Sequence, residues 1–365
     1  MTNTKKDKSD FVSIFDVARI DEAKKRFALD GSGICVAIID TGIDKNIDGI
    51  DESRIRHRVN ICPPSAKTEG AESHGTKMAI QIGLNSRNFG IAPFCSFVSI
   101  KAIDHEENLT TESLETALKW IQDNSATFGI NIVSISASLD GKYTSDNAKP
   151  SFSSICNLIT SLKTMHIPVI CSTGNKYHTT MPVFRQGLSF PAITADSISV
   201  GSIMNLYEKK STFDDLIKAF NCMPLQILPI SQRLSTDLAG RYATNILAPG
   251  YRMRQVDPND SSSYNFDGIG TSYSVAVMSG IIALLQQFYF RLHNKLPSVD
   301  YIKQLIQNTG RTVFDGDDEE VQHKYENAKD YRYSYSFYKA VDAFEAAYQI
   351  YCESNNHLPC KAEHG

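Results

Sequence analysis

The stretch Gly268-Ile269-Gly270-Thr271-Ser272-Tyr273-Ser274 leads directly into a long apolar segment that runs from Val275 to Leu292. Apolar residues recur in that segment at spacings of three and four, which predicts a helix. Its other faces carry small residues, so the helix should be buried on all sides. The N-terminus of a helix presents unpaired N–H groups and a partial positive charge. Ser272 is therefore either the cap of this helix or a nucleophile placed where negative charge develops.

The bulk composition is that of an ordinary globular protein. The chain has 365 residues, 42% of them hydrophobic and 21% charged, with a formal net charge of −4. This balance argues against a nucleic-acid-binding surface. No apolar run is expected to reach the roughly 20 residues of a membrane span, so no membrane association is expected. The first ten residues are charged with no apolar core behind them, which is unlike a signal peptide.

The eight cysteines stand at positions 35, 62, 95, 156, 171, 222, 352 and 360, with no Cys-x-x-Cys pair. Cys35, Cys95 and Cys171 lie in strand-like apolar runs, where a reduced thiol packs as a small hydrophobic group. Together with the missing export signal, this pattern predicts reduced thiols in a cytoplasmic protein. We expect no metal site and no cofactor; a structural calcium ion is possible but not supported, because no loop of clustered carboxylates is evident.

Apolar strand-like runs alternate with helical patterns along most of the chain. This alternation predicts an α/β fold with three layers, α/β/α, around a mostly parallel central sheet. Residues 43–72 look like a loop. The expected strands are 34–39, 96–100, 130–137, 167–172, 197–202 and 245–250, and the expected helices are 14–29, 73–83, 111–127, 152–165, 275–292, 299–307 and 337–351.

The domain organisation is expected to be simple. Residues 1–13 form a polar tail, residues 14–351 a single domain, and residues 352–365 a second tail. A polar and mixed stretch at about 204–241 reads as an insertion, with a short helix near 213–220. No internal repeat, low-complexity segment or linker divides the chain.

Polar residues stand at the ends of several predicted elements. Asp40 ends the first strand, His74 lies in the first turn of a helix, and Gly174-Asn175 follows another strand. Open α/β sheets place their chemistry at the carboxyl ends of strands. Taken singly, each of these residues also has a plain structural interpretation, as a turn aspartate, an ordinary histidine and a Gly-Asn turn.

Together these residues and their neighbours resemble the subtilisin-like serine peptidases over roughly residues 14–350. The order Asp, His, Ser is that of subtilisin. Short motifs that resemble those of the family follow in the matching order: Ala37-Ile38-Ile39-Asp40-Thr41-Gly42-Ile43-Asp44, His74-Gly75-Thr76, Gly90-Ile91-Ala92-Pro93, Ser172-Thr173-Gly174-Asn175, Phe190-Pro191, Ala248-Pro249-Gly250 and Gly270-Thr271-Ser272.

The resemblance implies a role for each residue. Ser272 would be the nucleophile, His74 its general base and Asp40 the group that orients the histidine. The oxyanion hole would contain the Asn175 amide and the Ser272 N–H, assisted by Thr271. The segment 134–138 would be an exposed strand that pairs with the substrate backbone. The substrate-binding residues implied are Ser136, Ala137, Ser138, Gly174 and Lys176.

The chain departs from the family pattern at three places. Family members usually carry a second histidine where Lys77 stands, and glycines where Ser138 and Leu139 stand. Ser138 would narrow the entrance to the pocket for the residue before the cleaved bond. Lys176 is either an exposed turn residue or, if it points inward, a group that favours an acidic or polar residue there.

The sequence therefore predicts a serine endopeptidase that acts on a specific intracellular peptide or protein. Only about 30 residues precede the first predicted strand, so we expect an intracellular form without a large prodomain. The alternative is a catalytically silent subtilase-fold binding module. An α/β-hydrolase esterase is discounted because no Gly-x-Ser-x-Gly elbow surrounds Ser272. The oligomeric state is not predicted.

Overall fold

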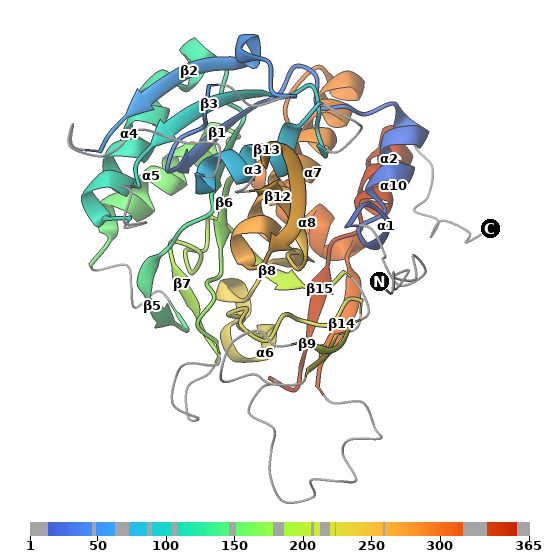
Figure 1. Ribbon diagram of the computed structural model, residues 1–365. Helices are drawn as coiled ribbons and strands as arrows, with labels where there is room; N and C mark the ends of the chain where they lie inside the picture. The colour runs from blue at the N-terminus through green and yellow to red at the C-terminus, as the bar shows by residue number, and fades with distance from the viewer. Residues whose placement is uncertain are drawn as a thin grey trace, which may run out of the picture.

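A nine-stranded sheet forms the centre of the molecule in the computed structural model (Figure 1). Its strand order is β14-β15-β11-β8-β6-β4-β1-β3-β2. The structure describes residues 14–45, 49–62, 73–85, 90–103, 109–145, 151–177, 186–205, 208–211, 220–222, 224–257, 260–316 and 334–355.

All neighbouring strands of this sheet run parallel except β14 and β15, which are antiparallel. The prediction of a mostly parallel sheet is confirmed. The strands are β1 (Cys35–Asp40), β2 (Ile55–Asn60), β3 (Ser96–Lys101), β4 (Ile132–Ile135), β6 (Val169–Ser172), β8 (Ile198–Ile203), β11 (Ile246–Pro249), β14 (Arg311–Asp315) and β15 (Ser336–Ala340).

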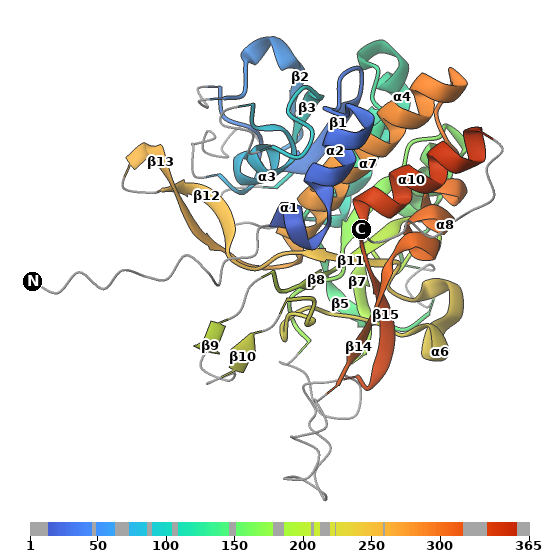
Figure 2. The same cartoon turned by 90° about the vertical axis from the view of Figure 1, so that its right-hand side faces the viewer.

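Helices cover both faces of the sheet, which confirms the three-layer prediction (Figures 1 and 2). Alternate residues of β1 separate the two layers: Val36 and Ile38 belong to one apolar cluster, and Ala37 and Ile39 to the other. The first cluster includes residues of α2 (Ile20–Phe27), α3 (His74–Gly83), α7 (Thr271–His293), α8 (Val299–Thr309) and α10 (Ala343–Ser354), and the second those of α4 (Thr111–Phe128) and α5 (Ser153–Thr164).

The predicted central helix is α7, which begins four residues earlier than expected, at Thr271. It packs against α3 and against β4, β6, β8 and β11. At 23 residues it is long and apolar enough to cross a membrane, contrary to the prediction that no run reaches that length. In this fold 72% of that apolar stretch is buried, so α7 is a core helix of the protein.

Four predicted segments differ from the structure, and two of them lie in the N-terminal part of the chain. The predicted loop 43–72 contains the edge strand β2, preceded by a short 3-10 helix at Glu52–Arg54. The predicted helix 14–29 is broken into α1 (Ile14–Val17) and α2, with Arg19 in the left-handed region between them.

The predicted helix 337–351 is a strand followed by a helix. Its first part is β15, which pairs with β14, and Asp342 then caps α10 by accepting a bond from the Glu345 N–H. Residues with helical spacing thus belong to a strand because an edge of the sheet is available to them. Helix α10 also continues to Ser354, three residues into the predicted C-terminal tail.

The predicted insertion at 204–241 is shorter than expected. Its described first part contains an antiparallel pair, β9 (Glu208–Ser211) and β10 (Phe220–Cys222), and most of the predicted helix 213–220 lies outside the described residues. From residue 227 to 235 the chain returns to the interior, where Leu228, Gln232 and Arg233 are buried. A short helix, α6 (Thr236–Ala239), follows. The polar side chains made this stretch resemble a loop, although hydrogen bonds allow them to be buried.

Two further antiparallel pairs were not predicted. Strand β5 (Leu139–Tyr143) pairs with β7 (Leu188–Phe190). Strands β12 (Met253–Asp257) and β13 (Asp260–Gly268) form a hairpin that projects from the rest of the ribbon in Figure 2. The end of β13 lies only a few residues before the start of α7.

Six described cysteines are free thiols, including the three that were predicted to pack as hydrophobic groups. Cys35 and Cys95 are fully buried, and this burial raises the pKa of each thiol to about 12. Both side chains therefore stay protonated at neutral pH and pack as apolar groups.

Candidate active site

Asp40 is the last residue of β1, a central strand between β3 and β4. Side chains alternate along a strand, so Asp40 faces the same layer as Val36 and Ile38, which is the layer of α3 and α7. Its side chain is fully buried, and Oδ1 accepts a hydrogen bond of 2.8 Å from the Thr41 N–H. The strand thus ends in a buried carboxylate on the α3 and α7 side.

His74 is the first residue of α3, a helix capped by Ser73, whose Oγ accepts from the Thr76 N–H. Nδ1 of His74 lies 2.9 Å from both carboxylate oxygens of Asp40. Because a carboxylate only accepts hydrogen bonds, Nδ1 carries the proton and Nε2 is the basic nitrogen. The His74 side chain is 26% exposed, so the ring bridges the buried carboxylate and the surface.

The close approach of α3 to the end of β1 depends on Gly75. A Cβ atom there would lie 2.4 Å from Gly42 O and 3.0 Å from Asp40 Cβ. The Gly75 N–H also donates a bond of 3.0 Å to Thr41 Oγ1. The sequence pattern indicates Thr41 only as part of a motif and does not reveal that it ties the histidine helix to the aspartate turn.

Ser272 is the second residue of α7 and is half-buried. Gly270 precedes the helix with φ +129°, a conformation that suits glycine, and its N–H donates a bond of 2.8 Å to Gly250 O. The Ser272 hydroxyl donates a bond of 2.7 Å to Ser136 O, while Ser136 Oγ donates a longer bond of 3.3 Å to Ser272 O. The side chain of Ser272 thus lies at the carboxyl end of β4, the neighbour of β1.

Asn175 follows β6 and lies against the first turn of α7. Its Oδ1 accepts two bonds of 3.0 Å, one from the Thr271 N–H and one from Thr271 Oγ1. A Cβ atom on Gly270 would come within 3.0 Å of Asn175 Nδ2. The amide is therefore oriented, with its acceptor on Thr271 and its donor nitrogen beside Gly270. Thr271, which was predicted to assist, acts in the structure as the partner of Asn175.

The predicted substrate strand 134–138 is only partly available. Ser134 and Ile135 are buried in β4 and paired with β1 and β6 on either side, so the prediction of an exposed strand was wrong for these two residues. Ser136 is buried just beyond the end of β4, and Ala137 and Ser138 are half-buried. Ser172 Oγ donates a bond of 3.4 Å to Ala137 O. Any pairing with a substrate would start at residue 136.

Gly174 and Lys176 flank Asn175 and differ in burial. Gly174 is buried at φ +104°, and its carbonyl accepts a bond of 2.8 Å from the Gln232 N–H. A Cβ atom on Gly174 would lie 2.2 Å from Gln232 Oε1. Lys176 is exposed, which agrees with the first of its two interpretations. The sequence pattern gives no sign of this role for Gln232, because the residue lies in the stretch predicted as an insertion.

The Asp40 carboxylate also affects Tyr273, the residue after Ser272. Burial and, next, the charge of Asp40 raise the pKa of the Tyr273 hydroxyl above its usual range. Across the residues described, no three His, Cys, Asp or Glu side chains are grouped so that they could hold a metal ion.

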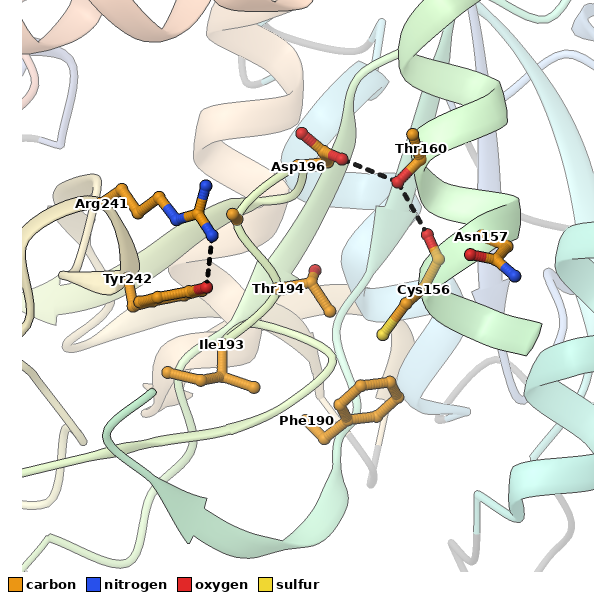
Figure 3. Close-up of a pocket in the computed structure, with 10 residues that line it drawn as sticks. Cys156, Asn157, Thr160, Phe190, Ile193, Thr194, Asp196, Arg241 and Tyr242 are labelled. Atoms are coloured by element: carbon orange, nitrogen blue, oxygen red, sulfur yellow. Dashed lines mark hydrogen bonds between the residues drawn. The ribbon is translucent and has the colours of Figure 1, made fainter. Parts of the chain in front are cut away.

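A separate cavity of about 180 Å³ lies between α5 and the turn after β7 (Figure 3). Its polar groups bond mainly to one another: Thr160 donates to Asp196, and Arg241 donates to the Tyr242 hydroxyl. None of the residues predicted for catalysis lines it. The residues that line the cavity are Cys156, Asn157, Thr160, Phe190, Ile193, Thr194, Ala195, Asp196, Arg241 and Tyr242.

Known proteins similar to this chain point to one family. M-protease of Shouchella clausii strain KSM-K16 is 23% identical over 263 residues, which cover 71% of this chain and 55% of M-protease. Serine protease AprX of Bacillus subtilis strain 168 is 24% identical over 301 residues, 77% of this chain and 62% of AprX. The chain thus spans somewhat more than half the length of these relatives.

A solved structure, that of the prenylagaramide maturation protease PagA, has the same fold. It superposes with a TM-score of 0.61 at 18% sequence identity and covers 91% of this chain and 98% of its own. The family model described as the subtilase family, Peptidase_S8, matches residues 31–333, which include every strand from β1 to β14. The chain therefore belongs to the subtilase family, the subtilisin-like serine peptidases.

Proposed function

We propose that this chain is a serine endopeptidase in which Asp40, His74 and Ser272 form the catalytic triad. The observation that carries the proposal is the contact between His74 Nδ1 and both oxygens of the buried Asp40 carboxylate, at 2.9 Å. This contact fixes the tautomer in which Nε2 accepts a proton. A histidine held in this way can accept the proton of a nearby hydroxyl. Ser272 lies at the N-terminus of the neighbouring helix α7.

The acylation step uses the Ser272 hydroxyl as nucleophile. The hydroxyl, which donates to Ser136 O in the structure, turns to His74 and transfers its proton to Nε2 as Oγ attacks the scissile carbonyl carbon. The imidazolium that forms is stabilised by the Asp40 carboxylate. His74 then gives the proton to the leaving amine, and the acyl group remains on Ser272. A water molecule releases it by the same steps, with His74 again as the base.

The tetrahedral intermediate carries its negative charge on the former carbonyl oxygen. We assign the donors to that oxygen as Asn175 Nδ2 and the Ser272 backbone N–H, which belongs to the first turn of α7. The support is the orientation of Asn175, whose Oδ1 is held by the N–H and the hydroxyl of Thr271. An amide held at its acceptor end needs little reorganisation when the charge develops.

Replacing Asn175 with alanine is expected to lower kcat by about 10²- to 10³-fold and to leave KM nearly unchanged, because the lost donor acts mainly in the transition state. The size is that known for an oxyanion donor of subtilisin. Steady-state kinetics on one peptide substrate measures the effect. Asn157→Ala, an exposed asparagine on α5, is the matched control and should keep full activity. A kcat within about twofold of wild type in Asn175→Ala would remove Asn175 from the oxyanion hole.

The substrate we propose is a specific peptide or protein of a reducing, cytoplasmic compartment. The free thiols of the described cysteines fit such a compartment, where disulfides are rare. PagA is named as a maturation protease, so processing of a peptide precursor is one activity consistent with this fold. We propose no cofactor, no nucleic-acid partner and no membrane partner.

The test of the proposed function is cleavage profiling on a peptide library derived from a proteome. Wild type should cut peptides internally at a limited set of sequences, and Ser272→Ala should cut none. Lys176→Ala should retain the wild-type preference, because Lys176 is exposed. If wild-type protein that is shown to be folded cuts no peptide, the catalytically silent binding module becomes the better account.

A further inference from the structure

The loop that carries Asn175 is anchored to the stretch 230–233, of which residues 231–233 are buried. The Gln232 N–H donates a bond of 2.8 Å to Gly174 O, and the Tyr177 N–H donates one of 3.1 Å to Ile230 O. These two bonds lie on either side of Asn175. The position of the amide therefore follows the position of 230–233.

The Tyr177 ring gives the loop a second attachment. The ring is buried, with an exposed fraction of 1%, and the Arg233 guanidinium stacks on it with its central carbon 3.5 Å from the ring centroid. Such a stack combines a cation–π attraction with close packing. Arg233 thus contacts a residue that is two positions from Asn175 in the chain.

The Arg233 guanidinium is itself fixed on its other edges. Nε donates a bond of 2.8 Å and Nη2 one of 3.3 Å to the two oxygens of Asp315, while Nη1 donates to Ser231 O at 2.9 Å. Both side chains of this ion pair are almost fully buried. Asp315, at the end of β14, also accepts bonds from the N–H and the hydroxyl of Ser334. The plane of the guanidinium is therefore set by the sheet edge, and a lysine could not reproduce this planar fork.

We propose that Arg233 is a positioning residue for the oxyanion hole. Held by Asp315, it fixes Tyr177 and the stretch 230–233, and these hold the loop so that Asn175 keeps its two bonds to Thr271. This inference rests on the proposed peptidase activity. It predicts that a change at Arg233 alters transition-state stabilisation through Asn175 and leaves the binding of substrate nearly unchanged, although Arg233 touches no substrate.

The test is a double-mutant cycle on kcat with Arg233→Lys and Asn175→Ala. Arg233→Lys keeps the charge but loses the fork, and we expect kcat to fall about tenfold with KM within about twofold of wild type, since a small misplacement of an oriented group is costly. In the Asn175→Ala background the same change should lower kcat by less than about twofold, because the group it positions is gone.

Arg19→Lys is the matched control, because Arg19 also pairs with a buried aspartate, Asp342, and lies 4.5 Å from the centroid of the Phe344 ring. It should lower the thermal midpoint without a change in kcat. Tyr177→Leu removes the ring on which Arg233 stacks and so tests the same contact. It serves as the test of the positioning role if Arg233→Lys does not fold. A folded Arg233→Lys or Tyr177→Leu variant with wild-type kcat, or with an equal loss in the Asn175→Ala background, overturns the positioning role. Absence of Ser272-dependent cleavage in wild type overturns the proposed function and this inference with it.

Discussion

Replacing Ser272 with alanine is expected to lower kcat by about 10⁶-fold, the size of the effect known for the nucleophile of subtilisin. This corresponds to roughly 8 kcal/mol of lost transition-state stabilisation. The reason is that the neighbouring aliphatic hydroxyls of this turn are engaged elsewhere, since Thr271 Oγ1 donates to Asn175 Oδ1 and Ser274 Oγ donates to Ala248 O. Substrate binding should be little affected, because only one oxygen atom is removed. The variant should also fold normally, since among the described residues Ser272 Oγ makes one hydrogen bond, of 2.7 Å to Ser136 O.

Steady-state kinetics on a peptide identified by the cleavage profiling measures this effect. The residual rate of the variant should come from the oxyanion hole and substrate binding alone. Ser154→Ala is a suitable control, because Ser154 lies on the exposed side of α5 and its hydroxyl donates to Glu115. It should keep wild-type kcat. A Ser272→Ala variant with more than about a tenth of the wild-type kcat would mean that another group is the nucleophile.

Replacing Asp40 with asparagine is expected to lower kcat by about 10⁴-fold, the size known for this change in a serine-peptidase triad. The shape of the side chain is nearly kept, so the loss has an electrostatic and tautomeric origin. In the structure both carboxylate oxygens face His74 Nδ1, and an amide would offer one acceptor and one donor there. The donor favours the tautomer with the proton on Nε2, which cannot accept the proton of Ser272.

The kcat of Asp40→Asn should be measured over a range of pH. The loss should persist across this range, because raising the pH does not move the proton of His74 from Nε2 back to Nδ1. Asp123→Asn is the matched control, since Asp123 is exposed on α4 and pairs only with Lys119 among the contacts described. It should leave kcat unchanged. A loss of less than about tenfold in a folded Asp40→Asn variant would show that the contact with His74 contributes little to catalysis.

The parallel core and the ends of its strands could be predicted because local patterns determine them. Strands β1, β3 and β6 are short apolar runs, and a run of that kind can be buried on both faces only in a covered parallel sheet. Asp40 and Asn175 then follow from chain order, since both stand where such a strand ends. The first turn of α3 was predictable from Ser73 and His74 for the same local reason.

The parts that were not predictable depend on contacts between distant segments. Residues 337–340 have helical spacing, but pairing with β14 makes them a strand. The stretch around Arg233 looks like a polar loop until its ion pair with Asp315, 82 positions away in the sequence, is known. Polar residues in a sequence indicate the surface unless a partner satisfies them, and the partner of Arg233 cannot be identified from local pattern. The same limit concealed the anchor of the Asn175 loop.

The central claim of this account is that Ser272 is a nucleophile activated by His74, and labelling with a fluorophosphonate measures this most directly. The folded wild-type protein should gain one covalent adduct, which peptide mass spectrometry should locate on Ser272. The adduct should be absent in Ser272→Ala and should form far more slowly in Asp40→Asn, because His74 is then held in the wrong tautomer. An adduct on another residue, or no adduct on folded wild-type protein at any pH tested, would contradict the account.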